Sequence, residues 1–348
     1  MQLCDHSTQL ASFSPSSSSR SRASMDLQES ITNQIDVTFM LTKHVFSEEN
    51  KRCLSTLISS KLWIMFTRLL QSLDFMNKAA EVAGQVNQWA KTKTNDLIKE
   101  ILPLGSVTNT TRMILPNALY FKGEWDEKFE AFNTKHHKFH FLDGESTRAP
   151  FMTSRKKQCI SVFKDFKVLK LFYKMGTNNN IPSIFSQSGD TRKFCMYFIL
   201  PDAHDGLPAL LDKITSEPGF LNRHIPSRQV EVGKLLIPNF KTTFGFEAPE
   251  VLKGLGLTLP FFPGGLDKMV DSAEAKALFV SNMFHKSFIE VNEGGTEAAA
   301  ATAAVIKVSR KFEAPPDFVA DHPFLFLIRD ESTGVVLFTG SVLNPRAD

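Results

Sequence analysis

The sequence predicts an α+β fold in which helices accompany mixed β-sheets, and three observations support this prediction. Apolar residues make up 42% of the 348 residues and charged residues 22%, which is ordinary globular usage and allows a sizeable buried core. Strand-like and helix-like segments follow one another without the regular alternation of a parallel βαβ fold. The 31 phenylalanines, against three tyrosines and three tryptophans, indicate aromatic strands packed inside that core.

Composition also limits the kinds of partner. The formal net charge is only +3, from 40 basic and 37 acidic residues, so we expect no nucleic-acid partner, which would require a concentrated basic stripe. No stretch reaches the ~18 apolar residues of a membrane-spanning helix, and we expect no membrane partner. The four cysteines form no C-x-x-C pair, so a disulfide framework is not expected.

The first 24 residues are rich in serine and contain one acid, which predicts a disordered extension. We expect a single domain over residues 25–348. The leader lacks the apolar centre of a secretory signal, although it resembles an organellar transit peptide. The sequence leaves the compartment open, with the extracellular space or the cytosol expected.

Three segments with helical character are predicted in the first third of the chain. Apolar positions over residues 31–46, among them Ile35, Val37 and Met40, recur at helical spacing. A dense apolar run over residues 53–76 fits either one buried helix or a helix followed by a strand. A clearer helical stripe then runs from Val82 to Ile101, and the helix is expected to end at the following proline and glycine.

The rest of the chain alternates between predicted strands and short helices. Strands are expected over residues 113–121 and 194–200, and the second is apolar enough to be buried on both faces. Short helices are expected over residues 207–214 and 249–256. We expect a long hairpin over residues 228–246, centred on Pro238 and Asn239.

The chain is predicted to end in a buried hairpin. Its strands are expected over residues 324–329 and 335–340, and Thr333-Gly334 supplies the bend.

No enzyme motif appears. The chain has no G-x-S-x-G, H-E-x-x-H, P-loop or G-x-G-x-x-G, and we predict that it is not an enzyme. Two small groups, one around His204 with its flanking aspartates and the other Asp321-His322, could be imagined as parts of a triad. The first group follows a strand end in a turn, where these residue types are common for backbone reasons.

Three neighbouring histidines, His136, His137 and His140, could bind a metal, with Asp143 as a further ligand. Phenylalanines alternate with polar residues there, which is strand spacing and indicates histidines on an exposed face. We therefore expect no metal and no cofactor.

The most informative segment covers residues 290–316, EVNEGGTEAAAATAAVIKVSRKFEAPP. Its alanine run fits a helix by propensity alone. Against this, Gly294-Gly295 provides a flexible pivot before the run, and β-branched residues follow it instead of a helix cap.

An extended loop that must slide between two strands of a sheet explains the segment better. Every second side chain would then enter a packed interior, where an added methylene costs on the order of 1 kcal/mol. Every second residue from Thr296 onward has a small side chain: Thr296, Ala298, Ala300, Thr302 and Ala304.

These residues resemble the serpins, and the plant serpins of Z type most closely. Residues 293–302, EGGTEAAAAT, resemble the family hinge E-x-G-T-E-A-A-A-A-T, and residues 117–125, NALYFKGEW, resemble N-A-x-x-F-K-G-x-W of its central sheet. Residues 317–328 with 334–340 resemble its C-terminal strands, and residues 284–286 match its strand histidine. The resemblance runs from about residue 77 to 345, and again over residues 25–46.

The resemblance implies a serpin-like fold with a large mixed central sheet, further sheets, flanking helices and an exposed reactive-centre loop at about residues 293–316. It also implies a serine-type endopeptidase inhibitor that acts as a suicide substrate and traps its target by loop cleavage and insertion. The chain is expected to be a monomer. The hinge residues are Glu293, Gly294, Gly295, Thr296, Glu297, Ala298, Ala299, Ala300, Ala301 and Thr302.

Further roles follow from the resemblance. Asn117 and His285 would support the opening of the central sheet, and Trp125 would lie beneath the end where insertion begins. Counting as the family does gives Ser309-Arg310 as the cleaved bond. A trypsin-like serine protease or a basic-specific cysteine protease would instead favour Arg310-Lys311, and both alternatives stay open.

One departure favours another interpretation. The family has an N-V-x-F-S-P-x-S-I stretch and several helices after the first helix, and these are missing or unrecognisable around residues 47–76. The alternative is therefore a non-inhibitory or degenerate serpin-fold protein that is cleaved as a substrate or only binds a partner.

Overall fold

The structure is a computed structural model in which part of the chain is described: residues 29, 32–40, 42–43, 73–111, 113–174, 193–254, 256–266, 278–296 and 314–347. Three predictions lie outside these residues, namely the disordered extension, most of the apolar run from residue 53, and the loop from Glu297 with its cleaved bond.

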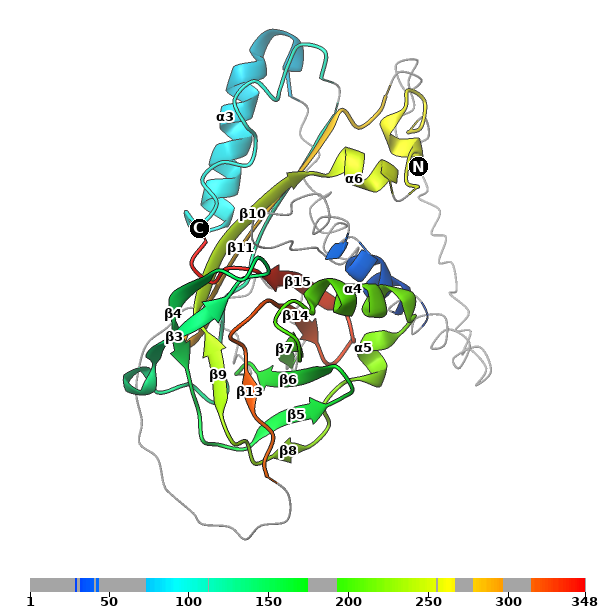
Figure 1. Cartoon of the computed structure of the whole chain (residues 1–348). Helices are drawn as coiled ribbons and strands as arrows, with labels where there is room; N and C mark the ends of the chain where they lie inside the picture. Colours follow the sequence, from blue (N-terminus) through cyan, green and yellow to red (C-terminus); the bar gives the residue numbers. More distant parts are fainter. Residues whose placement is uncertain are drawn as a thin grey trace, which may run out of the picture.

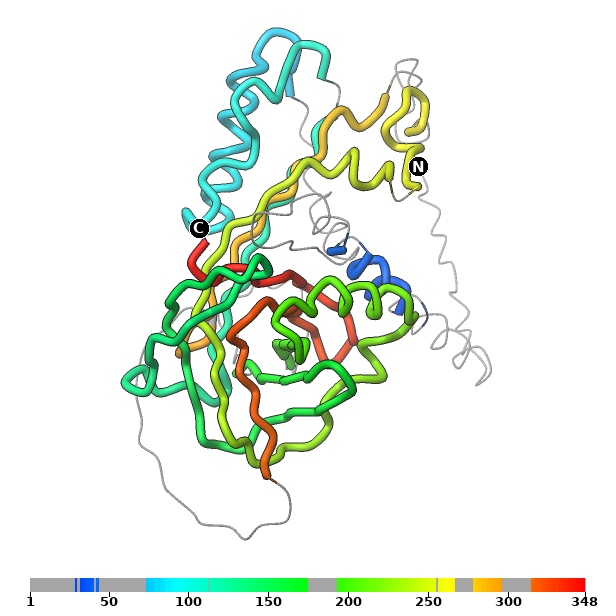
Figure 2. Tube along the Cα trace, in the orientation of Figure 1, coloured from blue at the N-terminus to red at the C-terminus, as the bar shows by residue number. Residues whose placement is uncertain are grey.

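Several mixed sheets with few helices make up the described fold, which confirms the predicted α+β class (Figure 1). A three-stranded sheet contains β1 (Ile114–Tyr120), β11 (Asn282–Val291) and β10 (Phe240–Glu247), with β11 in the centre. In Figure 2 these three segments run alongside one another although they lie far apart in the sequence.

The other two large sheets form the lower body of the molecule (Figure 1). The six-stranded sheet has the order β15 (Val336–Val342), β14 (Phe324–Asp330), β7 (Phe194–Pro201), β6 (Phe166–Phe172), β5 (Gln158–Val162) and β8 (Gln229–Val230). The four-stranded sheet has the order β13 (Phe318–Val319), β9 (Leu235–Pro238), β4 (Ser146–Met152) and β3 (Lys135–His140).

The remaining elements are short. β2 (Gly123–Glu124) pairs with β12 (Gly295–Thr296) as a sheet of two strands. The helices are α3 (Phe75–Lys93), α4 (Leu207–Ser216), α5 (Phe220–Arg223) and α6 (Ala248–Gly254), with 3-10 turns η1 (Ala131–Asn133) and η2 (Leu259–Phe261). None of the helices in the described part of the chain has the length and apolar character needed to cross a membrane.

The N-terminal helix buries a different face from the predicted one. Residues 32–40 and 42–43 are helical, and Ile35 and Phe39 pack with α4 and the six-stranded sheet. Val37 and Met40, which the sequence places among the apolar stripe, are exposed. Threonines at positions 38 and 42 complete the buried face, because their hydroxyls donate to the carbonyls four residues earlier.

The helix predicted to end near Pro103 ends ten residues earlier, as α3. The Asp74 side chain caps its start by accepting from the backbone N–H of Asn77. After Lys93, Asn95 and Asp96 take positive φ angles of 50° and 64°, which reverses the chain. Ile98, Ile101 and Leu102 then fold back and pack with Val82 and Ala90 of α3. The apolar stripe predicted for one longer helix is therefore shared between α3 and a segment that folds back on it.

The predicted hairpin centred on Pro238 and Asn239 is wrong. β9 and β10 follow each other directly but belong to different sheets, because β9 pairs with β4 while β10 pairs with β11. The Asn239 N–H donates to the carbonyl of Pro150, which holds the chain where it passes from one sheet to the other. One strand is buried and the other alternates between buried and exposed residues, and both patterns also occur in hairpins. The local pattern alone therefore cannot tell the two topologies apart.

The other strand and helix predictions are confirmed as β1, β7, α4 and α6. β7 is buried along almost its whole length, as its continuous apolar character indicates. The C-terminal hairpin β14–β15 is also confirmed, with Gly334 in its turn at a φ of 77°. The largest apolar cluster lies between the sheets and contains residues from β3, β4, β6, β7, β9, β11 and β14.

Candidate functional site

The segment predicted to be a mobile hinge begins where β11 ends. The chain turns at residues 292–294 and enters β12, which pairs antiparallel with β2. Gly295 lies opposite Glu124, and Thr296 lies opposite Gly123. The described start of the loop is therefore extended and already joined to the strand segment that continues β1.

Backbone hydrogen bonds anchor this hinge at its turn. The Trp125 N–H donates to the Gly294 carbonyl at 3.0 Å, and Asn292 and Gly295 exchange N–H···O bonds of 2.9 and 3.2 Å. The N–H of Phe129 donates to the Glu293 carbonyl at 2.9 Å. The turn is thus held by the segment that follows β1.

The Glu293 side chain ties the hinge to two further segments. Its Oε1 accepts from the Thr134 hydroxyl at 2.5 Å and from the Asn239 side-chain amide at 3.0 Å. Burial alone would raise the pKa of this carboxyl, but the two hydrogen bonds outweigh burial and lower its pKa below 4.5. The carboxylate therefore stays ionised at neutral pH and accepts from both partners.

Trp125 packs directly beneath the hinge. Only 1% of its surface is exposed, and its indole stacks on Tyr173 with ring centroids 4.6 Å apart. The indole N–H donates to the carbonyl of Asn292 at 2.8 Å. Trp125 therefore contacts the turn from which the loop begins.

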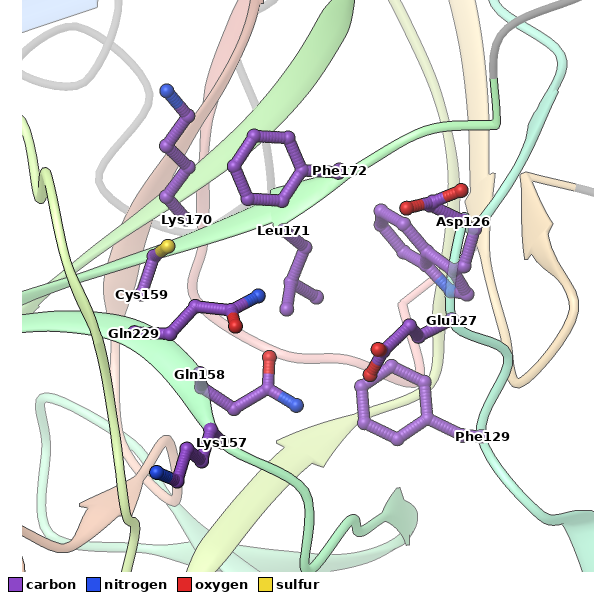
Figure 3. Close-up of a pocket in the computed structure, with 11 residues that line it drawn as sticks. Asp126, Glu127, Phe129, Lys157, Gln158, Cys159, Lys170, Leu171, Phe172 and Gln229 are labelled. Atoms are coloured by element: carbon purple, nitrogen blue, oxygen red, sulfur yellow. The ribbon is translucent and has the colours of Figure 1, made fainter.

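A pocket borders this segment on its other side. Figure 3 shows Glu127 and Phe129 facing Gln158 and Gln229, with Leu171 of β6 between the two groups. The lining comes from the segment after β2, from β5 and β6, and from β8. The hinge support is therefore continuous with the six-stranded sheet.

Gly295 occupies a position that only glycine can take. Its φ is 127°, a conformation that residues with a Cβ rarely adopt. A Cβ at this position would lie 2.3 Å from the Gly123 carbonyl oxygen and 2.6 Å from the Trp125 nitrogen. Because these are backbone atoms, no side-chain movement could make room.

The seam between β1 and β11 contains the other two predicted residues. The strands are parallel, and Asn117 and His285 are direct partners in their register. Both are buried, with 5% and 7% of their surfaces exposed. The His285 ring lies 5.4 Å from that of Phe246 on β10. Within the described residues, the Asn117 Oδ1 atom has no hydrogen-bond partner.

The structure thus brings Asn117 and His285 together in the middle of the seam and places Trp125 at the hinge, with Glu293, Gly294, Gly295 and Thr296. Residues Glu297 to Thr302 of the predicted hinge lie outside the described residues, as do Ser309, Arg310 and Lys311.

Sequence reasoning missed the partners of the hinge. Thr134 and Asn239 lie 159 and 54 residues from Glu293 in the sequence. Tyr173 follows β6, and an isolated bridge pairs it with Trp125. Neither their spacing nor their residue type distinguishes them from other polar or aromatic residues, so no local pattern could have identified them.

The described thiols do not form a nucleophilic centre. Cys159 and Cys195 are both buried. Burial first, and then the charge of Glu331, raise the pKa of the Cys195 thiol to about 12. The hinge is instead held by backbone pairing and close packing.

Comparisons with known proteins bear on this arrangement. A family model described as serpin (serine protease inhibitor) matches residues 7–345. Serpin-ZXA of Oryza sativa subsp. japonica is 58% identical over 275 residues, which cover 79% of this chain and 66% of that protein. Serpin-ZX of Hordeum vulgare is 56% identical over 279 residues, covering 79% and 67%. The chain thus spans about two thirds of the length of these relatives.

Solved structures agree. The Arabidopsis serpin AtSerpin1, in its native stressed conformation, superposes with a TM-score of 0.73 and 39% identity, over 92% of this chain and 98% of that one. Uncleaved ovalbumin superposes with a TM-score of 0.64 over 87% of this chain and 81% of that one, and at 23% identity this likeness concerns the fold alone.

Proposed function

Because this chain belongs to the serpin family, we propose that it is a protease inhibitor that acts as a suicide substrate for a serine or cysteine protease. The protease attacks a peptide bond of the loop after Thr296 and forms an acyl-enzyme. The cleaved loop then enters the central sheet as a new strand, and the attached protease is carried along and distorted. The observation that carries the proposal is the pairing of β12 with β2.

The pairing defines a register for insertion. Gly295 lies opposite Glu124 and the strands are antiparallel, so each further loop residue meets a residue one position earlier, and Thr302 meets Asn117. Counting along β11 from the bridge between Asn292 and Gly295 brings the same Thr302 to His285. The two counts agree because Asn117 and His285 are partners across the seam.

The same residue register predicts which side chains of the inserted loop would face the core. On β11, Ile289 and Val291 belong to the main core, whereas Phe284 and Phe288 pack beneath α3. Odd-numbered positions of β11 therefore face the core. Since an even-numbered loop residue pairs with an odd-numbered one, the core-facing set is the small set, Thr296, Ala298, Ala300, Thr302 and Ala304.

Insertion of the loop would also increase the number of backbone hydrogen bonds in the sheet. The closed seam is one parallel ladder of seven residue pairs. A strand inserted into it replaces this ladder by two antiparallel ladders, which are slightly more stable per residue. At about 0.5–1.5 kcal/mol net per hydrogen bond, one additional ladder of roughly seven bonds contributes on the order of 4–10 kcal/mol.

The target follows from the basic residues of the loop. Arg310, with Lys311 after it, suits a trypsin-like serine protease or a basic-specific cysteine protease, because such enzymes place an acid opposite a basic side chain. The proposal includes both candidate bonds, Ser309-Arg310 and Arg310-Lys311. Sequencing the new N-terminus after cleavage distinguishes them.

The test is incubation of the full chain with trypsin, followed by a denaturing gel. We expect a covalent complex that survives boiling. Thr296→Arg brings a charge to the core-facing side and should convert the inhibitor into a cleaved substrate, because an unpaired buried charge costs several kcal/mol. Glu297→Arg is the matched control on the opposite face and should still trap. Equal trapping by both variants would contradict the insertion register.

A second candidate is a serpin-fold protein that is cleaved without trapping. Two observations favour it: the buried Asn117 Oδ1 atom lacks a partner among the described residues, and the family stretch expected around residues 47–76 is missing or unrecognisable. Cleavage near Arg310 without a complex, and without a rise in Tm of the cleaved protein, would support this candidate over inhibition.

A further inference from the structure

We propose that His140, His204, Asp321 and His322 form a binding site for a transition-metal dication such as Zn²⁺. We call these four residues the histidine cluster. The His204 ring contacts both other imidazoles, with centroids 4.8 Å from His140 and 4.7 Å from His322. One ligand atom each from His204, Asp321 and His322 lie within 4.8 Å of one another.

The four residues come from three separate parts of the fold. His140 ends β3, His204 follows β7, and Asp321-His322 connects β13 to β14. The cluster therefore sits where the four-stranded sheet meets the six-stranded sheet. The His140 backbone N–H donates to the Asp321 carbonyl at 2.7 Å, which fixes the end of β3 against the connecting segment.

His322 is oriented as a metal ligand. It is buried, with 5% of its surface exposed, and its Nε2 contacts the Pro201 carbonyl at 2.8 Å. A carbonyl oxygen only accepts, so Nε2 carries a proton and Nδ1 is the ring nitrogen left to bind an ion. Donation of the other ring N–H to a backbone carbonyl is the usual outer-shell support of a metal-binding histidine.

The Nδ1 atom of His322 already faces a carboxylate. It lies 2.9 Å from Asp321 Oδ1, so a dication bound to Nδ1 would also be within reach of this carboxylate oxygen. Imidazole nitrogens with one carboxylate form a ligand set typical of zinc.

The third ligand can reach the ion without rearranging the core. Ligand atoms around tetrahedral zinc lie about 3.3 Å apart, given Zn–N distances of about 2.0 Å. His204 is exposed, so a rotation of its side chain closes the gap to the other two residues. His140 is half-buried, and its ring centroid lies 4.8 Å from that of His204.

The sequence suggested a different set. His136, His137, His140 and Asp143 lie near one another in the chain, but His136 is exposed on β3 and belongs to no cluster of metal ligands in the described structure. Only His140 joins the new site. Its partners are distant in sequence, which is why the spacing of the histidines did not reveal them.

The experiment uses the full chain, freed of metal with a chelator and then titrated with Zn²⁺ by calorimetry. We expect one ion per chain and a Tm that rises with Zn²⁺ concentration. Co²⁺ should give the visible absorption of a tetrahedral site. His204→Ala should weaken Zn²⁺ binding at least tenfold, and folding should be retained because this side chain is exposed.

His136→Ala is the matched control, since it removes an exposed histidine of β3 outside the cluster. It should bind Zn²⁺ as tightly as the unchanged chain. Asp321→Asn provides a second variant and should also weaken binding. Equal affinity of the His204 and His136 variants, or no Zn²⁺ retained by the unchanged chain after dialysis, would overturn the proposal. The measurement involves no protease, so its result is independent of the proposed inhibition.

Discussion

Substituting Gly295 with alanine should open the hinge locally while leaving the rest of the molecule folded. The φ of 127° alone costs a residue with a Cβ about 1–3 kcal/mol. The new Cβ would also lie 2.3, 2.6 and 2.7 Å from three backbone atoms of residues 123–125, all closer than real Cβ contacts. Because backbone cannot yield as a side chain can, β12 must move away from β2.

The size of the effect follows from the bonds that break. Three of the backbone hydrogen bonds that hold the turn involve Gly294 or Gly295, one from Trp125 to Gly294 and two exchanged by Asn292 and Gly295. At about 0.5–1.5 kcal/mol each, their loss lowers the local free energy of opening by about 1.5–4.5 kcal/mol. Since 1.4 kcal/mol is a factor of ten, the Trp125 amide should exchange about 10- to 1000-fold faster.

Hydrogen exchange of the Trp125 amide is the assay, read by NMR or mass spectrometry on the native chain. Gly144→Ala is the control, because Gly144 also has a positive φ, of 87°, but nothing lies within 4 Å of an added Cβ. It should leave the Trp125 amide protected. If Gly295→Ala exchanges as slowly as the unchanged chain, the close packing of the hinge against β2 is refuted.

The remaining predictions concern the same part of the fold and the buried thiols. Trp125→Phe removes the indole N–H bond to Asn292 and some packing, and should lower the free energy of unfolding by about 1–2 kcal/mol, measured in urea by circular dichroism. Because the pKa of Glu293 is lowered in the folded protein, this residue stabilises the fold above pH 4.5, and its contribution is lost as the pH falls through the folded pKa. Glu293→Gln should abolish that part of the acid dependence of stability. An unchanged dependence of stability on pH would contradict the prediction. With the other two cysteines replaced by serine, Cys159 and Cys195 should not react with a thiol reagent at neutral pH until the chain unfolds, because burial raises both pKa values.

Local pattern predicted the elements whose contacts are near in sequence or whose burial is uniform. The continuous apolar run of β7 and the paired runs of the C-terminal hairpin were identified correctly, because strand burial and tight turns leave a signal within a few residues. The hinge motif and the alternation of small residues after Gly295 are likewise properties of consecutive positions, and they sufficed to indicate the family.

What the sequence alone determined is therefore the strands β1, β7, β14 and β15, and the family. Only the tertiary structure decided that α3 stops at Lys93, that β9 and β10 part into separate sheets, that Glu293 binds Thr134 and Asn239, and that distant histidines meet. The physical reason is that each of these depends on which surfaces pack together. Such contacts join residues tens to hundreds of positions apart, and no periodicity along the chain records them.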